Sequence, residues 1–187
     1  MTLETPRLLL RPWEESDAQD LFECAKDPRV GPIAGWPAHD TVETSLETIR
    51  TVFAVPYVFA VVPKEVGKPV GAISLQLGKN SNFPLPDTEG EIGYWIGVPY
   101  WGQGLIPEAV KELLRWGFAD LHLEKIWCGY FEGNDKSWRV QEKCGFTYHH
   151  TNRDVPWPLT GDTRTEHISC LTRQDWAAGQ QENPLHN

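Results

Sequence analysis

Two glycines, Gly102 and Gly104, stand between an apolar run and a segment with helical spacing. A strand that turns through glycines into a helix directs unpaired backbone N–H groups and the positive end of the helix dipole to one point. Glycine also lets a ligand approach the backbone closely, and Pro107 gives up an N–H that a first helical turn does not need. The turn therefore predicts an anion site that suits pyrophosphate. A tight strand-to-helix connection without a ligand would use the same glycines.

The glycine turn does not match the best-known phosphate loops. It is not G-x-x-x-x-G-K-[ST], and it lacks the third glycine of the G-x-G-x-x-G dinucleotide fingerprint. ATP and dinucleotides are therefore weaker candidates than another diphosphate ligand.

A second pair of polar residues, Asn134 and Ser137, stands at the start of another helical segment, "NDKSWRVQEKCG". Both would face the N-terminus of that helix, where they could contact a ligand. Asn134 is also a favoured helix N-cap, and Ser137 could be a solvated first-turn residue. Both interpretations stay open on the sequence alone.

Three carboxylates, Asp87, Glu89 and Glu91, lead into the apolar run "EIGYWIGV". Because side chains alternate along a strand, Glu89, Glu91 and Trp95 share one strand face. Such a cluster would attract an ammonium group through its field. It could equally serve only to keep a surface loop soluble.

The hydrophobic pattern predicts the elements that position these residues. Strands are expected at 7–11, 57–62, 69–77, 91–98, 125–130, 146–151 and 166–172, and helices at 17–26, 41–53, 106–121 and 134–145. In the second helix, Thr44 and Glu47 have capping-box spacing, and Gly145 is placed for a left-handed cap at the end of the last one. The order is β-α-α-β-β-β-α-β-α-β-β, a mixed α/β sheet in one domain over 1–176. Residues 78–90 read as a loop, and 177–187 as a flexible tail.

The composition indicates one globular domain. Of 187 residues, 40% are apolar, and the net charge is −9, which argues against nucleic acid as a partner and favours cationic substrates. The four cysteines lack paired or metal-ligand spacing, so we expect reduced thiols and no metal site. The sequence shows neither the apolar core of a signal peptide nor the ~18 apolar residues of a membrane span. We therefore expect a cytoplasmic protein with no membrane partner.

Together, these segments resemble the GNAT superfamily of N-acetyltransferases, and within it the branch of the ribosomal-protein alanine acetyltransferases. The resemblance covers nearly the whole chain, through "TPRLLLRPWEESDAQDLF", "DPRV", "EIGYWIGVPYWGQGLIPEAV", "WGFADLHLEKI", "NDKSWRVQEKCGF" and "LTRQDW". It implies a single-domain α/β fold whose mixed, mostly antiparallel sheet splays between the fourth and fifth strands. It also implies acetyl-CoA as the co-substrate.

The family's phosphate loop, [QR]-x-x-G-x-[GA], falls on residues 101–106, and of its defining positions only Gly104 matches. Trp101 stands in place of Gln or Arg, and Ile106 in place of a small residue, but backbone donation survives both changes. The resemblance implies that the pantetheine arm pairs with the fourth strand. The residues it assigns to the cofactor are Trp95, Ile96, Gly97, Val98, Trp101, Gly102, Gln103, Gly104, Leu105, Ile106, Asn134 and Ser137.

The resemblance also implies direct attack of a primary amine on the thioester. Such an amine must lose a proton, and we expect Glu91 to be the base, with Glu89, Asp87 or water as alternatives. A backbone N–H near Trp95 or Ile96 would stabilise the oxyanion. Ser137 would hydrogen-bond to the leaving sulfur, either donating its proton or only stabilising the charge.

The resemblance and the charge pattern also suggest residues that would bind the acceptor. Trp36 lies in a Gly- and Pro-rich loop that resembles a substrate lid, and Asp87 and Glu89 would attract a cationic acceptor. The basic residues Lys136, Arg139 and Lys143 could meet the cofactor's 3'-phosphate or form a solvated face.

We therefore predict an acetyl-CoA-dependent N-acetyltransferase that acts on a protein N-terminus or a small-molecule amine, as a monomer or homodimer. A non-catalytic acyl-CoA sensor of the same fold is the alternative, since such a domain need not keep both Glu91 and Ser137. An unrelated nucleotide-binding enzyme is a third possibility, which tight ATP binding without competition from CoA would favour.

Overall fold

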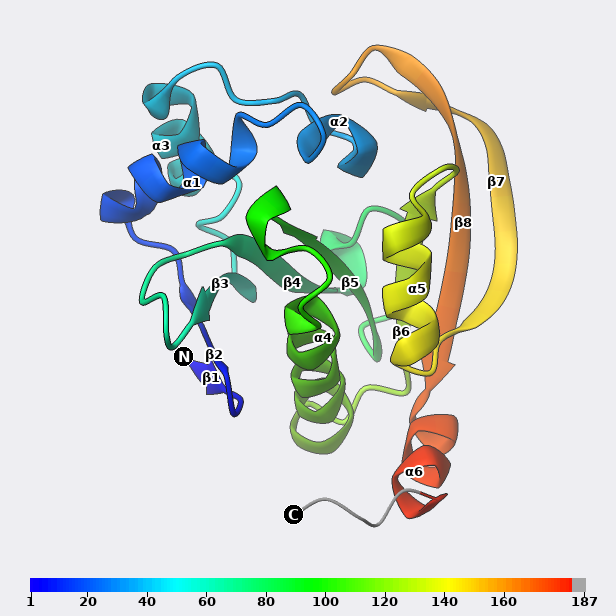
Figure 1. The fold of residues 1–187 in the computed structure, drawn as a ribbon. Helices are drawn as coiled ribbons and strands as arrows, with labels where there is room; N and C mark the ends of the chain where they lie inside the picture. The colour runs from blue at the N-terminus through cyan, green and yellow to red at the C-terminus, as the bar shows by residue number, and fades with distance from the viewer. Residues whose placement is uncertain (183–187) are drawn as a thin grey trace.

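An eight-stranded mixed sheet organises the chain in the computed structural model, which describes residues 1–182 (Figure 1). The strand order is β1-β2-β3-β4-β5-β6-β8-β7. The strands are β1 (Leu3–Glu4), β2 (Leu8–Pro12), β3 (Val58–Pro63), β4 (Gly71–Leu77), β5 (Glu89–Ile96), β6 (Lys125–Phe131), β7 (Thr147–Trp157) and β8 (Asp162–Thr172).

Helices cover both faces of this sheet. They are α1 (Ala18–Ala25), α2 (Gly31–Ala34), α3 (Val42–Thr51), α4 (Leu105–Arg115), α5 (Asp135–Lys143) and α6 (Arg173–Glu182), and a π-helical turn (Trp116–Asp120) extends α4. The main core joins α4 to one face and contains Ile92 of β5, with Tyr94 packed against it. A second cluster, formed by α1 and α3, receives Trp95 on the other face. The alternation of β5 therefore sends Tyr94 and Trp95 to opposite sides of the sheet.

The sheet opens between β5 and β6, its one parallel pair within residues 1–182. Their register ends at Glu91↔Trp127, although β5 continues to Ile96 and β6 to Phe131. The other neighbouring strands are antiparallel. The expected fold class, with a splay between the fourth and fifth predicted strands, is confirmed. Figure 1 shows α4 and α5 side by side in front of this gap.

The structure adds elements that the hydrophobic pattern missed, namely β1, α2 and α6. It also lengthens the last hairpin, which was expected at 146–151 and 166–172 but spans Thr147–Trp157 and Asp162–Thr172. The extension contains Pro156, a positive φ of 53° at Asp154 and a register shift between Asn152 and Val155. Proline and bulges interrupt the alternation by which strands are recognised, so this half of the hairpin reads as a loop.

The expected capping box at Thr44 and Glu47 is wrong. Thr41 is the N-cap of α3, because its hydroxyl accepts a hydrogen bond of 3.1 Å from the Thr44 N–H. Thr44 instead donates its hydroxyl to Asp40 at 2.5 Å. The left-handed cap at Gly145 is confirmed by its φ of 86°.

The chain beyond residue 176 was expected to be a flexible tail, but α6 continues through Glu182. The Thr172 hydroxyl accepts from the Asp175 N–H at 3.1 Å and donates to its carboxylate at 2.6 Å, which fixes the helix start. Trp176 packs against Phe118, with ring centroids 5.5 Å apart. Residues 183–187 lie outside the described part of the chain, and no described helix combines the length and apolarity of a membrane-spanning segment.

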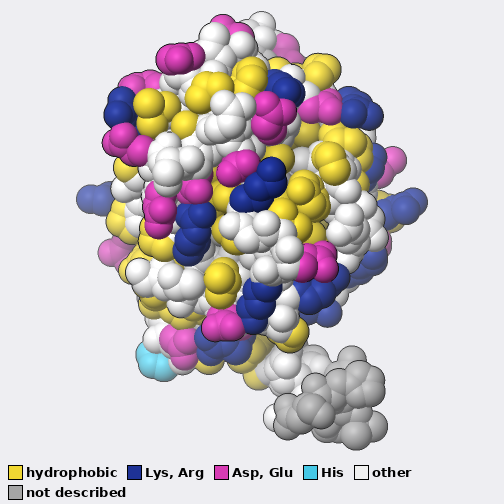
Figure 2. All heavy atoms as spheres, turned by 60° about the vertical axis from the view of Figure 1, so that its left-hand side comes forward, with side chains coloured by type: hydrophobic (Ala, Val, Ile, Leu, Met, Phe, Trp, Pro, Cys, Tyr) yellow, Lys and Arg dark blue, Asp and Glu magenta, His cyan; other side chains and the backbone are white. Residues whose placement is uncertain are grey.

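Charged side chains of both signs are interspersed over the face shown in Figure 2. The exposed ion pairs of the structure include Arg50–Glu15 at 2.7 Å and Lys64–Glu4 at 2.6 Å. Such exposed pairs contribute little to stability, because solvent and salt screen the attraction. The apolar cores on the two faces of the sheet therefore hold the site in place.

Candidate active site

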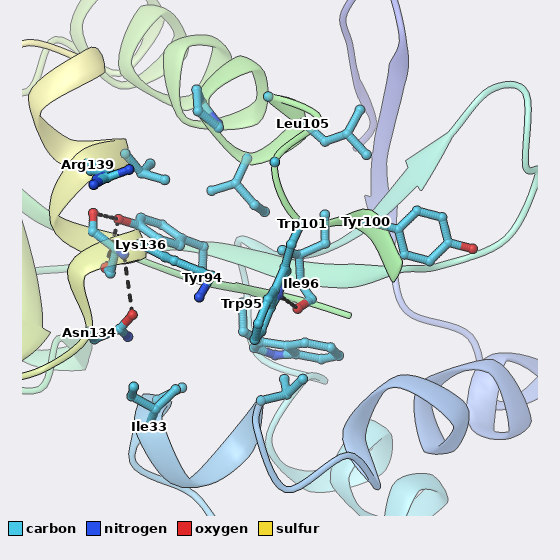
Figure 3. Close-up of a pocket in the computed structure, with 18 of the residues that line it drawn as sticks. Ile33, Tyr94, Trp95, Ile96, Tyr100, Trp101, Leu105, Asn134, Lys136 and Arg139 are labelled. Carbon is cyan, nitrogen blue, oxygen red and sulfur yellow. Dashed lines mark hydrogen bonds between the residues drawn. The ribbon is translucent and has the colours of Figure 1, made fainter. Parts of the chain in front are cut away.

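A cleft of about 330 Å³ opens where β5 separates from β6. Figure 3 shows the side chains that converge on it from β5, the turn before α4, α5 and α2. Its lining includes Arg29, Ile33, Tyr94, Trp95, Ile96, Tyr100, Trp101, Gly102, Gly104, Leu105, Ile106, Asn134, Lys136, Ser137, Arg139 and Lys143. The gap in the sheet and the N-termini of α4 and α5 thus face one space.

The glycine turn forms one wall of the cleft. Gly102 and Gly104 each have φ of 74°, and α4 begins at the next residue, Leu105. A Cβ built on Gly102 would meet nothing within 4 Å, which leaves open space over the backbone. Arg7 holds the turn from outside by donating to the Gln103 carbonyl at 2.9 Å and pairing with Glu108 at 2.6 Å. The first-turn N–H groups of α4, which have no intrahelical acceptors, therefore remain for an anion.

Four basic residues, Arg29, Lys136, Arg139 and Lys143, line the same cleft. The Lys136 ammonium lies 4.3 Å from the centroid of the Trp101 ring, a cation–π contact. In a chain with a net charge of −9, this concentration of positive charge suits a polyanion. The glycine cradle together with these cations fits the diphosphate and the 3'-phosphate of CoA.

Trp101, which replaces the Gln or Arg of the phosphate-loop pattern, has a structural contact. Its indole N–H donates to the Ile96 carbonyl at 2.9 Å, so the ring is hydrogen-bonded to the last residue of β5. Gly97, Val98 and Gln103 were also assigned to the cofactor but lie outside the cleft lining. The Gly97 N–H donates to Val70 on the far side of β5, at 2.8 Å. The other residues assigned to the cofactor line the cleft.

Asn134 and Ser137 meet at the start of α5, as expected. The Asn134 side chain accepts from the Ser137 N–H at 3.3 Å and is therefore the N-cap of α5, while both residues also line the cleft. The Ser137 hydroxyl lies 3.0 Å from the Tyr94 hydroxyl. Sequence reasoning missed Tyr94, although strand alternation alone puts it on the face opposite Glu91.

Glu91 lies on the other face of β5, at the last paired position before the splay. It is only 6% exposed, and its two oxygens accept from the Asn82 N–H at 2.7 Å and the Asn82 side-chain amide at 2.9 Å. Burial raises the pKa of Glu91, and the hydrogen bonds from Asn82 partly oppose that rise. A buried carboxylate with a raised pKa is a candidate proton acceptor.

Glu166 is a second carboxylate on this face, which sequence reasoning missed. Burial is the main cause that raises the pKa of Glu166, and the nearby charge of Glu91 raises it further. Its Oε1 would be 2.8 Å from a Cβ built on Gly129, so the carboxylate lies over β6 at a position without a side chain. The signal was available only through tertiary structure, because β8 joins β6 across a long sequence separation.

The other two carboxylates of the expected cluster have different surroundings. Glu89 accepts from the Trp127 indole N–H and lies 4.0 Å from the Lys125 ammonium. Asp87 is exposed, and its Oδ1 would be 2.6 Å from a Cβ on Gly78. Neither residue lines the cleft.

Trp36 follows α2 and packs edge-on against Trp95, with ring centroids 5.3 Å apart. Just before it, the Gly35 carbonyl accepts from the Trp157 indole at 2.6 Å, which ties this loop to β7. Figure 1 shows the β7–β8 hairpin reaching over toward α2. Trp36 therefore lies beside the β5 residue that borders the gap, next to the cleft rather than in its lining.

The comparisons with known proteins agree with this geometry. The model of the acetyltransferase (GNAT) domain matches residues 7–147. The uncharacterized N-acetyltransferase YoaA of Bacillus subtilis is 27% identical over 150 residues, covering 77% of this chain and 81% of YoaA. The ribosomal protein uS5-alanine N-acetyltransferase of Escherichia coli is 28% identical over 89 residues, covering 48% of this chain and 45% of that protein.

Among solved structures, a GNAT-family acetyltransferase from Bacillus anthracis superposes with a TM-score of 0.81 at 22% identity. The match covers 93% of this chain and 99% of that one, which shows a shared fold. The family match spans the glycine turn, both carboxylates at the start of β5 and the N-terminus of α5. This chain therefore belongs to the GNAT family of acetyl-CoA-dependent N-acetyltransferases, with the ribosomal-protein alanine acetyltransferases among its relatives.

Proposed function

We propose that this chain acetylates a primary amine by direct attack on acetyl-CoA, with Glu91 as the base and Ser137 beside the leaving sulfur. The observation that carries the proposal is the position of these two residues around one gap. Glu91 lies at the start of the gap on the α1–α3 face, and Ser137 lies with Tyr94 on the α4–α5 face. An amine that enters from one face would meet a thioester that reaches the gap from the other.

The cofactor assignment rests on the cleft. The α4 N-terminus and the glycine turn would hold the diphosphate, while Arg29, Lys136, Arg139 and Lys143 would offset the remaining phosphate charge. When bound, acetyl-CoA supplies the activated acetyl group. The protein's residues orient acetyl-CoA, accept the proton of the amine and stabilise the leaving sulfur.

Glu91 is the proposed acceptor of the proton that the attacking amine must lose. Lysine-type amines titrate near ~10.4 and α-amines near ~8, so at neutral pH an acceptor arrives mostly as its ammonium ion. Glu91 is buried beside the gap and, in its carboxylate form, can accept that proton directly or through water. Glu166 keeps a second acidic group near it. Both favour an ammonium ion on this face.

The oxyanion donor follows from strand geometry. Along β5 the backbone groups of successive residues point alternately to the two neighbouring strands. The Gly97 N–H donates toward β4, and the Thr88 carbonyl accepts from Glu124 on the β6 side. This alternation directs the Ile96 N–H, rather than that of Trp95, into the gap. We assign Ile96 as the backbone donor to the developing oxyanion.

The acceptor is proposed to be a protein N-terminus or a small-molecule amine. The alanine N-acetyltransferase among the relatives favours a peptide amine. The lid-like loop at Trp36 and the β7–β8 hairpin border the face from which such an acceptor would enter. Asp87 and Glu89 lie at the beginning of β5 and would add negative charge on the approach.

Thermal unfolding tests the cofactor assignment. CoA at a hundredfold excess over Kd should add about 2.7 kcal/mol of stability, which corresponds to roughly 5–10 °C in Tm for a domain of this size. ATP and NAD at the same concentration should shift Tm much less. Equal shifts from the three ligands would contradict a CoA-specific cleft. A screen of amines for thiol release from acetyl-CoA then tests turnover.

A change at Asn82 tests Glu91 through its pKa. The Asn82 side chain lowers the pKa of Glu91, so Asn82→Ala should raise it further. Because the base must be deprotonated, the acidic limb of the kcat/KM profile should move to higher pH, while the alkaline limb stays in place. Asn80→Ala, two residues away in the same loop, is a matched control. A limb that stays in place or moves to lower pH would contradict this role.

A further inference from the structure

Tyr94 makes two contacts with Ser137 that the proposed function does not use. From β5, its hydroxyl oxygen lies 3.0 Å from the Ser137 hydroxyl oxygen and 3.0 Å from the Ser137 carbonyl oxygen. Figure 3 shows the ring extending from β5 to the first turn of α5, with both contacts drawn as dashed lines. Tyr94 and Ser137 both line the cleft, so a ligand there would lie beside this pair.

The hydroxyl hydrogens of Tyr94 and Ser137 can be arranged in two ways. A carbonyl can only accept, so while Tyr94 donates to the Ser137 carbonyl, the Ser137 hydroxyl can donate to the Tyr94 oxygen. If Tyr94 instead donates to the Ser137 hydroxyl oxygen, the serine hydrogen is free to point into the cleft. Both states use the same heavy-atom positions, so only hydroxyl rotation separates them.

The second state is the one that a developing thiolate would favour. A hydroxyl that accepts a hydrogen bond becomes a stronger donor, because the bonds of a chain polarise one another. The Ser137 backbone is fixed by its N–H bonds to the Asn134 side chain at 3.3 Å and the Asn134 carbonyl at 3.1 Å. In the second state the backbone is fixed and the Ser137 oxygen is held by Tyr94, so the serine hydrogen can turn toward a sulfur in the cleft.

Tyr94 is unsuited to lose its own proton. Burial raises its pKa well above the usual value, and Cys128, buried behind it with Sγ at 4.0 Å from the hydroxyl, would disfavour a phenolate further. Tyr94 therefore remains protonated throughout the reaction. It acts on the position and donor strength of Ser137.

We propose that Tyr94 is a positioning residue that turns the Ser137 hydroxyl toward the thioester sulfur and strengthens it as a donor. This inference rests on the proposed function. It assigns to a β5 side chain a part in leaving-group stabilisation on the α4–α5 face.

A double-mutant cycle of Tyr94→Phe and Ser137→Ala tests the proposal. Ser137→Ala should lower kcat roughly 10- to 100-fold, and Tyr94→Phe about 10-fold, with little change in the Kd of CoA. Since Tyr94 acts through Ser137, adding Tyr94→Phe to Ser137→Ala should cost no further activity. Tyr57→Phe, which alters another half-buried tyrosine packed on the same core, should leave kcat unchanged.

Multiplicative losses in the cycle would overturn the proposal, because a general structural effect of Tyr94 persists without the serine. An unchanged kcat in Tyr94→Phe would overturn it as well. If Tyr94→Phe folds poorly, a fluorinated tyrosine at position 94 preserves the shape and donates more strongly. It should retain or raise kcat, and a loss as large as that of Tyr94→Phe would contradict donation to Ser137.

The same measurements separate this inference from the proposed function. A wild-type chain that releases no thiol from acetyl-CoA with any amine would refute amine acetylation and this inference with it. An active wild type whose Tyr94→Phe variant is equally active would refute only the role of Tyr94.

Discussion

Glu91→Gln should lower kcat by roughly 10²- to 10⁴-fold, the usual contribution of a general base. Glutamine keeps the size of the side chain and can still bond to Asn82, but it cannot accept the proton that the ammonium group must lose before the amine attacks. The Kd of CoA should change little, because Glu91 lies on the face of β5 opposite Tyr94 and outside the cleft lining. Steady-state kinetics over a range of pH would measure the loss.

The pH profile is the more specific readout. In the wild type, activity should fall as pH drops through the pKa of Glu91, and because burial raises that pKa, the limb should lie above the ordinary range of a glutamate. In Glu91→Gln this limb should flatten. Glu89→Gln on the same strand face is the matched control, because Glu89 is already bonded to Trp127. A Glu91→Gln variant with normal kcat and an unchanged limb would shift the role to Glu89, Asp87, Glu166 or water.

The fold was predictable wherever one local pattern dominated. The apolar runs of the central strands and the 3.6-residue period of α4 gave elements that the structure confirms to within a few residues. The closing hairpin was only half recognised, because Pro156 and the bulge near Asp154 break its alternation. The short α2 has one turn, Gly31–Ala34, too short for a helical period to show.

The site was predictable to a similar extent, for a related reason. Residue type at a predicted helix start was enough to identify four residues of the site, Gly102, Gly104, Asn134 and Ser137. The structure brings all four to one cleft. Tyr94 and Glu166 carry no such local signal. Tyr94 can be connected with Ser137 only once β5 and α5 are known to meet at the gap. Glu166 can be placed near the site only once β8 is known to pair with β6. Partners set by tertiary contacts cannot be read from spacing along one segment.

Gly104→Val should weaken CoA binding by at least about tenfold. Gly104 has φ of 74°, a conformation that a β-branched residue adopts only with strain of order 1–3 kcal/mol. The strained backbone would turn the first N–H groups of α4 away from the diphosphate, whereas the added Cβ itself would lie toward Arg7, 3.6 Å from its guanidinium. Loss of one or two charge-assisted hydrogen bonds, at about 1.5–3 kcal/mol each, accounts for an effect of this size.

Stability alone could also lower affinity, and Gly67→Val controls for it. Gly67 has φ of 73° in the hairpin between β3 and β4, and its Cβ position has nothing within 4 Å, so the same substitution brings similar strain at a residue outside the cleft lining. Both variants should lose a similar amount of Tm, whereas only Gly104→Val should lose CoA affinity in calorimetric titration. Equal affinities would place the diphosphate away from the glycine turn. Equal losses of affinity would show that backbone strain anywhere in the fold weakens the cleft, and the turn would then be a structural connection rather than a phosphate site.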